Sequence, residues 1–517
     1  MTTKTLDETV VQVSGLEIHK CTVVSAGPTF MDFKFTMLEL NYFEDLFSNV
    51  VSGTLIINDS NGFHNKLSWC GDEYLLLEFN KPDTRDDKQK FPPFKGIFRI
   101  FSTESRHLTG REYNENFVLH FCSEESFLSS RMKISKSYKN MRISDIVIDI
   151  AVNILKIPKN KLGYDPRSKT YANIEETFDK RDIVIPNMQP LEAINWLSTM
   201  AISDPANKFG NHGGLEGGAT FFFYNNRYGW YFRSLLSIFN TVNQSRYRSP
   251  MLLSGSDEGY WYGVKNAEYP KGMALHVDPH NQILSYQIQD TFDAVQKNLR
   301  SIMSNKLIAI DYLRRTHEEK IFDYEKYFNN HLSKKVELYK EYNTKPILSN
   351  AEDRFKKTHN DYQTVWKIAP STTNQKNNPY IKKRQPNISA NYVENTIPYR
   401  FAQIGLMNYN NLKLLIPGDP YISTGRLIYV YLPQPTQTET AKKPQDRFLK
   451  GWYLVSCVRQ KIDQTNFQTV LECVKDSYNS DVDVYDTKNI APGLAVFDNS
   501  NTMIMQIRAG TFDWEIE

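Results

Sequence analysis

Apolar and polar residues alternate along most of the first 123 residues, which is the pattern of strands with one buried face. Between turn-forming residues lie six stretches of this kind: IHKCTVVSA, MDFKFTMLELNYFE, VSGTLIIND, EYLLLEF, GIFRIFSTESRHLT and NENFVLHFCS. Asp59-Ser60-Asn61-Gly62 predicts a tight turn, because Asn and Gly tolerate positive φ. Residues 1–123 are therefore predicted to form a small antiparallel β-barrel or sandwich.

After Ser123 the apolar residues recur three and four positions apart, as in helices. This spacing predicts helices over residues 125–130, 143–155, with Ser144 as N-cap, and about 190–202, with Leu191, Ile194, Trp196 and Leu197 buried. ATFFFYNNRYGWYFRSLLSIF predicts a hairpin with Asn225-Asn226 at its turn. Another helix is predicted over about 285–300. Residues 124–300 are thus expected to form a mixed α/β domain with a β-hairpin extension.

The β pattern returns after residue 300. NKLIAIDYLRRTHEEKIFDYEKYF predicts two strands with a polar turn at residues 316–318. Further strands are predicted in LKLLIPGDPYISTGRLIYVYLPQP, GWYLVSCVRQKID and FQTVLECVKDS. Residues 301–344 and 396–480 are therefore expected to form a second barrel, similar to the first and beside it. The polar, Asn- and Pro-containing residues 345–395 predict an extended insertion, and residues 481–517 an acidic C-terminal arm.

Composition narrows the class of protein. A chain of 517 residues with 40% hydrophobic and 23% charged residues is typical of a folded protein with several domains. The aromatic share of 13% favours a β-rich assembly protein, and a net charge of +3 argues against a dedicated nucleic-acid binder. The start MTTKTLDETVVQV lacks the pattern of a signal peptide, and no apolar run approaches the roughly 20 residues that span a bilayer. We expect synthesis and folding in a cytoplasm, no membrane insertion, and five cysteines that are buried free thiols.

The sequence offers little for catalysis. GNHGGLEGG lacks the Gly-Lys-Ser/Thr of a phosphate-binding loop, and Gly255-Ser256 continues to Asp-Glu-Gly rather than to a nucleophile elbow. His276, Asp278 and His280 have a spacing that can supply metal ligands, but no third His or Cys lies near, so a surface loop is favoured. For the basic run 382–384, an exposed or partner-docking loop is favoured over single-strand binding. No catalytic, metal or cofactor site is predicted.

Motifs occur in a fixed order along the first 240 residues. LNYFEDLFSNVVSGTLIINDSNGF ends a strand in an Asp-x-x-Gly turn, and FCSEESFLSSRMKISKSYKNMRISDIVIDIA places a short helix and a Ser/Lys stretch before an Ile-x-x-Ile-Val helix. IPNMQPLEAINWLSTMA begins a helix with Pro-Asn-x-x-Pro and precedes the aromatic hairpin FFFYNNRYGWYFRSL. Together these segments resemble the central baseplate hub proteins of large contractile-tailed phages, relatives of the hub part of VgrG-type spikes in type VI secretion.

Further segments resemble a second barrel of that family. AIDYLRRTHEEKIFDYEKYF resembles a D-x-x-x-K and F-D-Y pattern, with Arg314 or Arg315 in place of Lys. LKLLIPGDPYISTGRLIYVYLPQP and FLKGWYLVSCVRQKID resemble its glycine-spaced strand pair and its G-x-Y-L-I-x-x-V-x-H strand, with Gln460 where His is common. The resemblance covers roughly residues 16–477, and residues 345–395 and the C-terminal arm depart from it. The family's signature structural positions are matched by Asp59, Gly62, Pro186, Asn187, Pro190, Asp311, Phe322, Asp323, Tyr324, Gly418, Gly425, Gly451 and Tyr453.

The resemblance implies a β-dominated α+β fold with two tail-tube-like antiparallel β-barrels plus smaller α/β domains. It implies a homotrimeric ring that joins the sixfold tail tube to the trimeric central spike. The partners would be the tail tube protein, the central spike protein and surrounding baseplate wedge proteins, with DNA passing through the channel without specific binding. The protein would be a virion structural protein of the phage tail baseplate, assembled in the host cytoplasm, and not an enzyme. A tail-associated cell-wall hydrolase and a host-glycan-binding tail protein are the alternatives.

Overall fold

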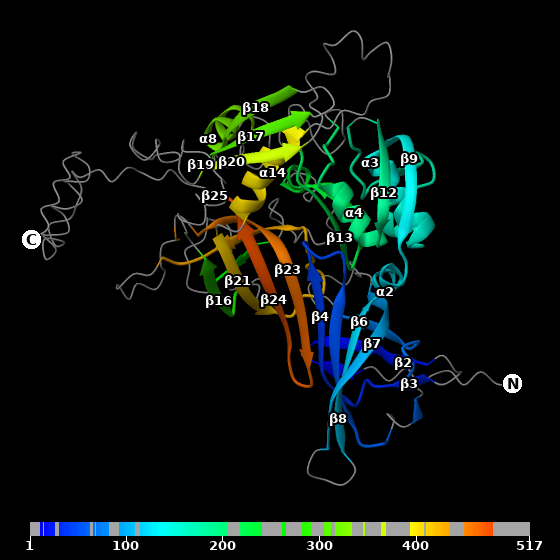
Figure 1. Ribbon diagram of the computed structural model, residues 1–517. Helices are drawn as coiled ribbons and strands as arrows, with labels where there is room; N and C mark the ends of the chain where they lie inside the picture. Colours follow the sequence, from blue (N-terminus) through cyan, green and yellow to red (C-terminus); the bar gives the residue numbers. More distant parts are fainter. Residues whose placement is uncertain are drawn as a thin grey trace, which may run out of the picture.

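The computed structural model describes residues 11–13, 15–25, 30–62, 66–67, 69–81, 93–108, 114–178, 180–204, 218–239, 261–264, 282–290, 304–311, 316–332, 345–346, 363–368, 393–407, 410–434, 446 and 449–478. Within them the fold is β-dominated, with one large sheet, several small sheets and few helices, as Figure 1 shows. No helix in these ranges is both long and apolar enough to cross a bilayer.

The N-terminal half of the large sheet contains all six strand regions predicted from the alternating pattern. Its strands are β1 (Val11–Val13), β2 (Leu16–Val24), β3 (Phe30–Asp32), β4 (Met37–Asp45), β5 (Ser52–Asp59), β6 (Tyr74–Asn80), β7 (Phe94–Leu108) and β8 (Glu115–Ser123). In β5 and β6 buried and half-buried residues alternate strictly, so one face packs on the core.

The C-terminal half of the sheet continues from β4 without a break (Figure 1). It consists of β15 (Trp261–Gly263), β16 (Ser285–Asp290), β21 (Asn410–Pro417), β22 (Leu427–Tyr431), β23 (Gly451–Asp463) and β24 (Phe467–Lys475). The strand order is β1-β2-β6-β7-β8-β5-β4-β23-β24-β21-β16. In addition, β3 pairs with β2, β22 pairs with β23, and β15 pairs with β22. Among the described strands no pairing closes either half, so the two predicted barrels are not confirmed.

One predicted helix is wrong where the structure describes it. Residues 285–290 form the strand β16, which pairs antiparallel with β21, instead of beginning a helix. Tyr286 and Ile288 alternate with Ser285 and Gln287, which is the period of a strand. The C-terminal half-sheet therefore takes two of its strands, β15 and β16, from residues before 300.

A mixed α/β unit follows the first half-sheet. It contains α2 (Glu124–Arg131), β9 (Ile134–Arg142), α3 (Ile143–Asp149) continued by a π-helical turn (Ile150–Ile154), a 3-10 turn (Lys159–Leu162), β10 (Tyr164–Asp165), β11 (Thr170–Tyr171), β12 (Lys180–Met188), α4 (Pro190–Ser198), β13 (Phe221–Asn226), β14 (Gly229–Ser234) and α5 (Leu235–Phe239). The helices predicted from the apolar spacing are confirmed. Helix α4 is shorter than expected, and Trp196 is only partly buried.

Two local predictions in this unit are wrong. Ser144 does not cap α3: the N-cap is Arg142, and the Ser144 N–H donates to Thr177 Oγ1 at 3.0 Å, so a residue from another segment satisfies the helix start. The β13–β14 turn lies at Arg227 and Tyr228, two residues later than expected, because Asn226 pairs with Gly229. The Asn226 carboxamide accepts from the Tyr228 N–H at 2.9 Å, an Asx-turn contact.

A small three-stranded sheet lies beyond the mixed unit, at the top of Figure 1. It is formed by β18 (Thr316–Asp323), β17 (Ser304–Asp311) and β20 (Gln363–Ile368), with α8 (Tyr324–Tyr327), a π-helical turn (Phe328–Leu332) and α14 (Val393–Met407) next to it; β19 (Lys345–Pro346) pairs with β25 (Ser477–Tyr478) elsewhere. The hairpin β17–β18 was expected to begin the second barrel and does not join the large sheet. Its buried face packs on α14 instead: the Phe322 and Tyr399 rings are 4.8 Å apart. Its turn was predicted at residues 316–318, but these residues belong to β18 and pair with β17.

The described apolar residues form four cores, which show how the units are held together. One fills the N-terminal half-sheet, one the C-terminal half-sheet and one the mixed α/β unit. The fourth contains residues of β13, α5, β18, α8 and α14, together with residues of β22, β23 and β24. The small sheet, the hairpin and the C-terminal half-sheet therefore share one apolar core.

Candidate assembly interface

The central structural feature is the junction, the antiparallel pairing of β4 with β23 that unites the two half-sheets. The pairs run from Cys457 opposite Asp45 to Asp463 opposite Glu39. One face of the junction is buried, through the side chains of Leu40, Tyr42, Val458, Gln460 and Ile462. Two strands about 400 residues apart in the chain thus join the half-sheets into one continuous sheet.

The opposite face of the junction carries charged side chains of both signs. The Arg459 Nε donates to Asn41 Oδ1 at 2.9 Å, and both the Arg459 guanidinium and the Lys461 ammonium lie within 4 Å of the Glu39 carboxylate. The Arg459 guanidinium also lies over the Phe43 ring at 5.6 Å. Opposite charges across the strands favour this register.

Glu44 is a buried hydrogen-bonding centre beside the junction. Glu44 is in β4, and only 2% of its surface is exposed. The carboxylate accepts hydrogen bonds from the Tyr42 hydroxyl at 2.9 Å, the Arg227 N–H at 2.7 Å and the Thr424 N–H at 3.0 Å. Burial raises the pKa of Glu44, and the backbone N–H groups of Thr424 and Arg227 oppose that rise. One carboxyl group therefore joins β4, the β13–β14 turn and the loop before β22.

The β13–β14 turn makes further contacts with that loop. The Arg227 guanidinium donates to the Pro420 carbonyl, and the Tyr228 hydroxyl donates to the Tyr421 carbonyl at 2.8 Å. The Asn226 carboxamide donates to the Thr424 carbonyl at 3.2 Å. The aromatic hairpin, predicted as an extension, thus fixes the mixed α/β unit to both half-sheets.

The large sheet repeats a four-strand order. The order β7-β8-β5-β4 in the first half is followed by β23-β24-β21-β16 in the second, with every neighbouring pair antiparallel. The first strand of each repeat has a register shift at the matching position, between Ile100 and Ser102 in β7 and between Val455 and Cys457 in β23. The shifts fix the correspondence between repeats, in which β7 matches β23 and β4 matches β16.

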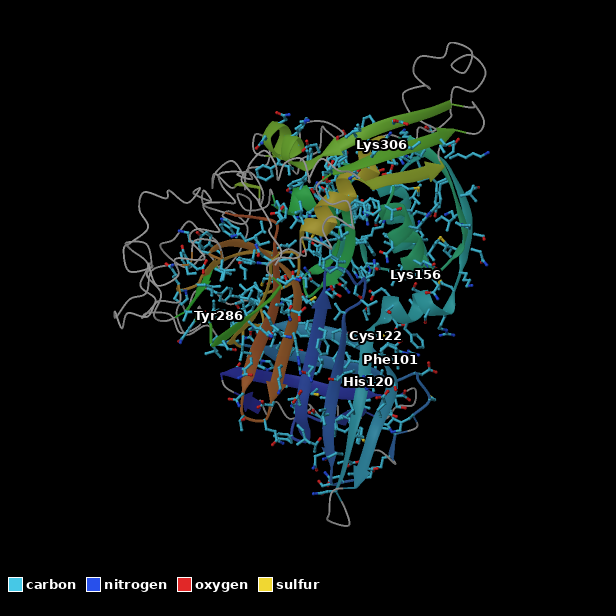
Figure 2. All side chains as sticks on the ribbon, turned by 60° about the vertical axis from the view of Figure 1, so that its left-hand side comes forward. Phe101, His120, Cys122, Lys156, Tyr286 and Lys306 are labelled. Carbon is cyan, nitrogen blue, oxygen red and sulfur yellow. The ribbon has the colours of Figure 1, made fainter. Side chains whose placement is uncertain are left out.

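Large apolar side chains are exposed along two strands of this sheet. On β16 and directly before it, Leu284, Tyr286 and Ile288 are 50%, 40% and 39% exposed. On β7, Ile97 and Phe101 are 65% and 53% exposed. Figure 2 shows Tyr286 and Phe101 on opposite sides of the β-rich part of the molecule.

The signature positions of the first half and of the mixed unit all have local structural reasons. Asp59 ends β5, and its carboxylate accepts from the Asn61 N–H at 3.0 Å, while Gly62 has a φ of 67°, as the predicted turn requires. Pro186 and Asn187 lie at a register shift of β12, where Asn187 has a φ of 49°. Pro190 is the first residue of α4, where its missing N–H costs nothing.

The positions in and after the β17–β18 hairpin belong to the central core. Asp311 is the last residue of β17, opposite Thr316. Phe322 and Tyr324 are buried, and the Asp323 carboxylate accepts from the Lys326 N–H at 3.2 Å. The F-D-Y motif therefore buries two rings and places a carboxylate at the start of α8.

The glycines of the C-terminal half-sheet allow close approach. A Cβ on Gly418 would overlap the Phe467 ring, and Gly425, with a φ of 77°, lies against the Tyr224 hydroxyl. Gly451 begins β23 with a φ of 131°. Tyr453 is buried, and its hydroxyl donates to the Leu449 carbonyl at 2.7 Å. These residues shape the β22–β23 region and its contact with the aromatic hairpin.

Gln460, which stands where the family commonly has His, is a buried polar link within the junction. Its Nε2 donates to the Asp419 carbonyl at 2.7 Å, and its Oε1 accepts from the Thr469 hydroxyl at 2.6 Å. Both functional groups of the carboxamide are satisfied, so the residue supports the loop that carries Gly418.

Several predicted features lie outside the described residues. These are His276, Asp278 and His280, the basic run 382–384, most of residues 345–395 and the acidic arm 481–517. Within the described ranges, no group of three or more His, Cys, Asp or Glu residues is arranged to hold a metal ion.

The five cysteines were expected to be buried free thiols; all are free, but Cys70 is exposed and Cys457 is half-buried. Sequence reasoning missed the buried centre at Glu44 and the strand β16. The alternation of Leu284, Tyr286 and Ile288 was a usable signal for the strand. For Glu44 the local sequence gave no signal, because its donors Arg227 and Thr424 are 183 and 380 residues away.

Comparisons with known proteins find similarity in solved structures. No family model and no curated protein matches the chain. A 43 kDa tail protein of prophage MuSo2 from Shewanella oneidensis is 8% identical, with a TM-score of 0.45, covering 88% of this chain and 98% of that one. A tail protein from Neisseria meningitidis is 10% identical, with a TM-score of 0.44 and coverage of 89% and 97%.

A third similar structure is an E. coli component of the type VI secretion system, itself described as similar to the T4 tail proteins gp27 and gp5. It is 10% identical with a TM-score of 0.36, and the match covers 87% of this chain and 76% of that one. These three solved structures are two phage tail proteins and a type VI secretion component.

Proposed function

We propose that this protein is a structural hub of a contractile phage baseplate, a homotrimeric ring between a sixfold tail tube and a trimeric central spike. The observation that carries the proposal is the repeated four-strand order within one sheet. A chain with two similar units side by side presents six units when three copies assemble. That arrangement suits a protein that adapts threefold to sixfold symmetry.

The contacts between the two repeats suit a part that transmits force. The backbone pairing of β4 with β23, the ion pairs of Glu39 and the buried Glu44 centre all join the halves, and the aromatic hairpin fixes the mixed unit to both. A load applied to one half is therefore shared with the rest of the chain. Relative motion of the halves would require breaking several buried contacts at once.

The partners follow from the same proposal. One end of the ring contacts the tail tube protein and the other the central spike protein, while residues 345–395 and the C-terminal arm contact surrounding wedge proteins. DNA passes through the channel without specific binding. Duplex DNA carries about one negative charge per 1.7 Å of helix axis, so a channel wall that is neutral or acidic would bind it only weakly.

The proposal is tested by the mass and activity of the purified full chain. Light scattering after size-exclusion chromatography should give three times the 60.1 kDa of one chain. A zymogram on peptidoglycan should show no clearing, and a glycan array no binding. A monomeric mass at micromolar concentration contradicts the ring, whereas clearing or specific glycan binding supports the hydrolase or the glycan-binding alternative.

A further inference from the structure

We infer that the outer edge of β16 pairs with the C-terminal half of β7 in a second copy of the chain, forming an antiparallel strand pair between copies. The inference rests on the proposed ring and names the strands that would close it. Its template is the junction, in which β4 already pairs with β23 inside one chain.

The repeat identifies the two edges. In the template, residues 451–454 of β23 pair with β22, and residues 457–463 pair with β4. In the matching strand β7, residues 94–99 pair with β6, whereas residues 101–108 pair only with β8 among the described strands. The counterpart of β4, which is β16, pairs only with β21 in the same part of the chain. Each copy therefore presents one edge of each kind.

The backbone of β16 is oriented for another strand. The Leu284 N–H donates to the Leu415 carbonyl at 2.8 Å, toward β21. The Leu415 carbonyl is thus directed at β16, and Leu415 lies opposite Ser285, so the N–H groups of Ser285 and Gln287 point toward β21. Since N–H directions alternate along a strand, those of Tyr286 and Ile288 point toward the outer edge. An exposed edge with such donors is a template for pairing with another chain.

The side chains on β16 match those buried at the template. Tyr286 and Ile288 correspond to Leu40 and Tyr42, because each pair lies opposite matching residues of β21 and β5. Leu40 and Tyr42 are 2% and 4% exposed beside β23, whereas Tyr286 and Ile288 are 40% and 39% exposed. A neighbouring strand at the β16 edge would give these two side chains the cover that β23 gives to their counterparts.

The β7 edge has the same relation to its counterpart. Phe101, at the register shift of β7, corresponds to Ser456 at the register shift of β23. Ser456 is 4% exposed and its carbonyl accepts from the Leu46 N–H across the junction, whereas Phe101 is 53% exposed. A second copy at this edge would cover an aromatic ring where the template covers a small side chain.

The template also fixes the register. Lys461 lies opposite Asn41 in the junction. Gln468 of β24 and Asn116 of β8 lie the same number of residues from the matched register shifts. Lys461 pairs with Gln468 and His107 pairs with Asn116, so Lys461 corresponds to His107. Asn41 corresponds to Gln287 through Thr54 and Lys413. We therefore expect His107 of one copy to lie opposite Gln287 of the next.

The two edges differ and lie on opposite sides of the sheet (Figures 1 and 2). A contact between unlike surfaces repeats from copy to copy and forms a closed ring or an open filament, whereas a twofold dimer uses the same surface twice. A second copy of this chain is thus the occupant that the repeat specifies, and a head-to-tail ring is its product.

The test is disulfide trapping in the full chain. A variant carrying His107→Cys and Gln287→Cys should, after mild oxidation, give reducible covalent dimers and trimers on denaturing gels. Each single variant should give no more covalent dimer than the wild type. The wild type carries the exposed native Cys70 and therefore sets the background. Glu104→Cys with Gln287→Cys is the matched control, because it uses the same two edges out of register.

A second variant tests the pairing without cysteine. Tyr286→Pro removes an N–H that points away from β21, so β16 should keep its hydrogen bonds to β21 while losing those to the next copy. We expect a monomer with unchanged circular dichroism, whereas Val184→Ser, which removes an exposed apolar side chain on β12, should remain trimeric. If the wild type is trimeric but the His107–Gln287 pair fails to cross-link, or Tyr286→Pro stays trimeric, the proposed strand pairing is wrong while the ring is retained. A monomeric wild type overturns both.

Discussion

Replacing Glu44 tests whether the buried carboxyl group holds the junction together. In Glu44→Ala, the Tyr42 hydroxyl and the backbone N–H groups of Arg227 and Thr424 lose their acceptor inside the protein. An unsatisfied buried donor costs about 1–3 kcal/mol, so three donors give a loss of about 3–9 kcal/mol in the free energy of unfolding. Glu44→Gln keeps one oxygen acceptor and should lose about 1–2 kcal/mol.

The measurement is urea unfolding followed by tryptophan fluorescence. Glu472→Ala is the matched control, because Glu472 is in the same sheet but 43% exposed and paired with Lys413 at the surface. An exposed ion pair contributes about 0–1 kcal/mol. A Glu44→Ala variant that unfolds within 0.5 kcal/mol of the Glu472→Ala variant would refute the structural role of the buried centre.

The pH dependence of the same variants gives an independent check. Because burial raises the pKa of Glu44 above its ordinary value of 4.5, the folded chain keeps a proton that the unfolded chain releases. Its contribution to stability is therefore complete below pH 4.5 and is lost as the pH rises through the folded pKa. The decline should be smaller in Glu44→Gln, and equal slopes for wild type and variant would contradict the sign.

Three further predictions concern the C-terminal half-sheet. Burial lowers the pKa of Lys475 to about 7, so the free energy of unfolding should rise as the pH increases from 7 toward 10.5, and Lys475→Met should flatten that rise in urea titrations at several pH values. Gly425→Ala should destabilise by about 2 kcal/mol or more through its positive φ and the Tyr224 hydroxyl 2.5 Å away, whereas Gly15→Ala, with a similar φ and open space, should lose about 1 kcal/mol in thermal unfolding. Gln460→Ala should lose about 2 kcal/mol by removing two buried hydrogen bonds, and an unchanged melting temperature would show that the loop does not depend on it.

Local patterns predicted the strands of the N-terminal half-sheet and β21 to β24 of the C-terminal half, because alternation follows directly from which face is buried. The turn at Gly62 and the start of α4 at Pro190 were predictable for the same kind of reason, since each depends on neighbouring residues. Ser144 was misassigned because a hydroxyl from Thr177, 33 residues away, satisfies the helix start.

The assembly of the sheet depends on contacts that no local pattern encodes. The pairing of β4 with β23 joins residues more than 400 positions apart, so Arg459 gave no sign of its partner Asn41. Residues 304–323 have strand periodicity, which predicts the hairpin but not the surface that it covers. That hairpin joined α14 because the Phe322 ring packs on the Tyr399 ring.

Electron cryomicroscopy of the purified full chain tests the central claim most directly. The account predicts a closed threefold ring with a central channel, in which six similar four-strand units alternate between first and second repeats. A monomeric particle, a twofold dimer or an assembly without a channel would contradict it.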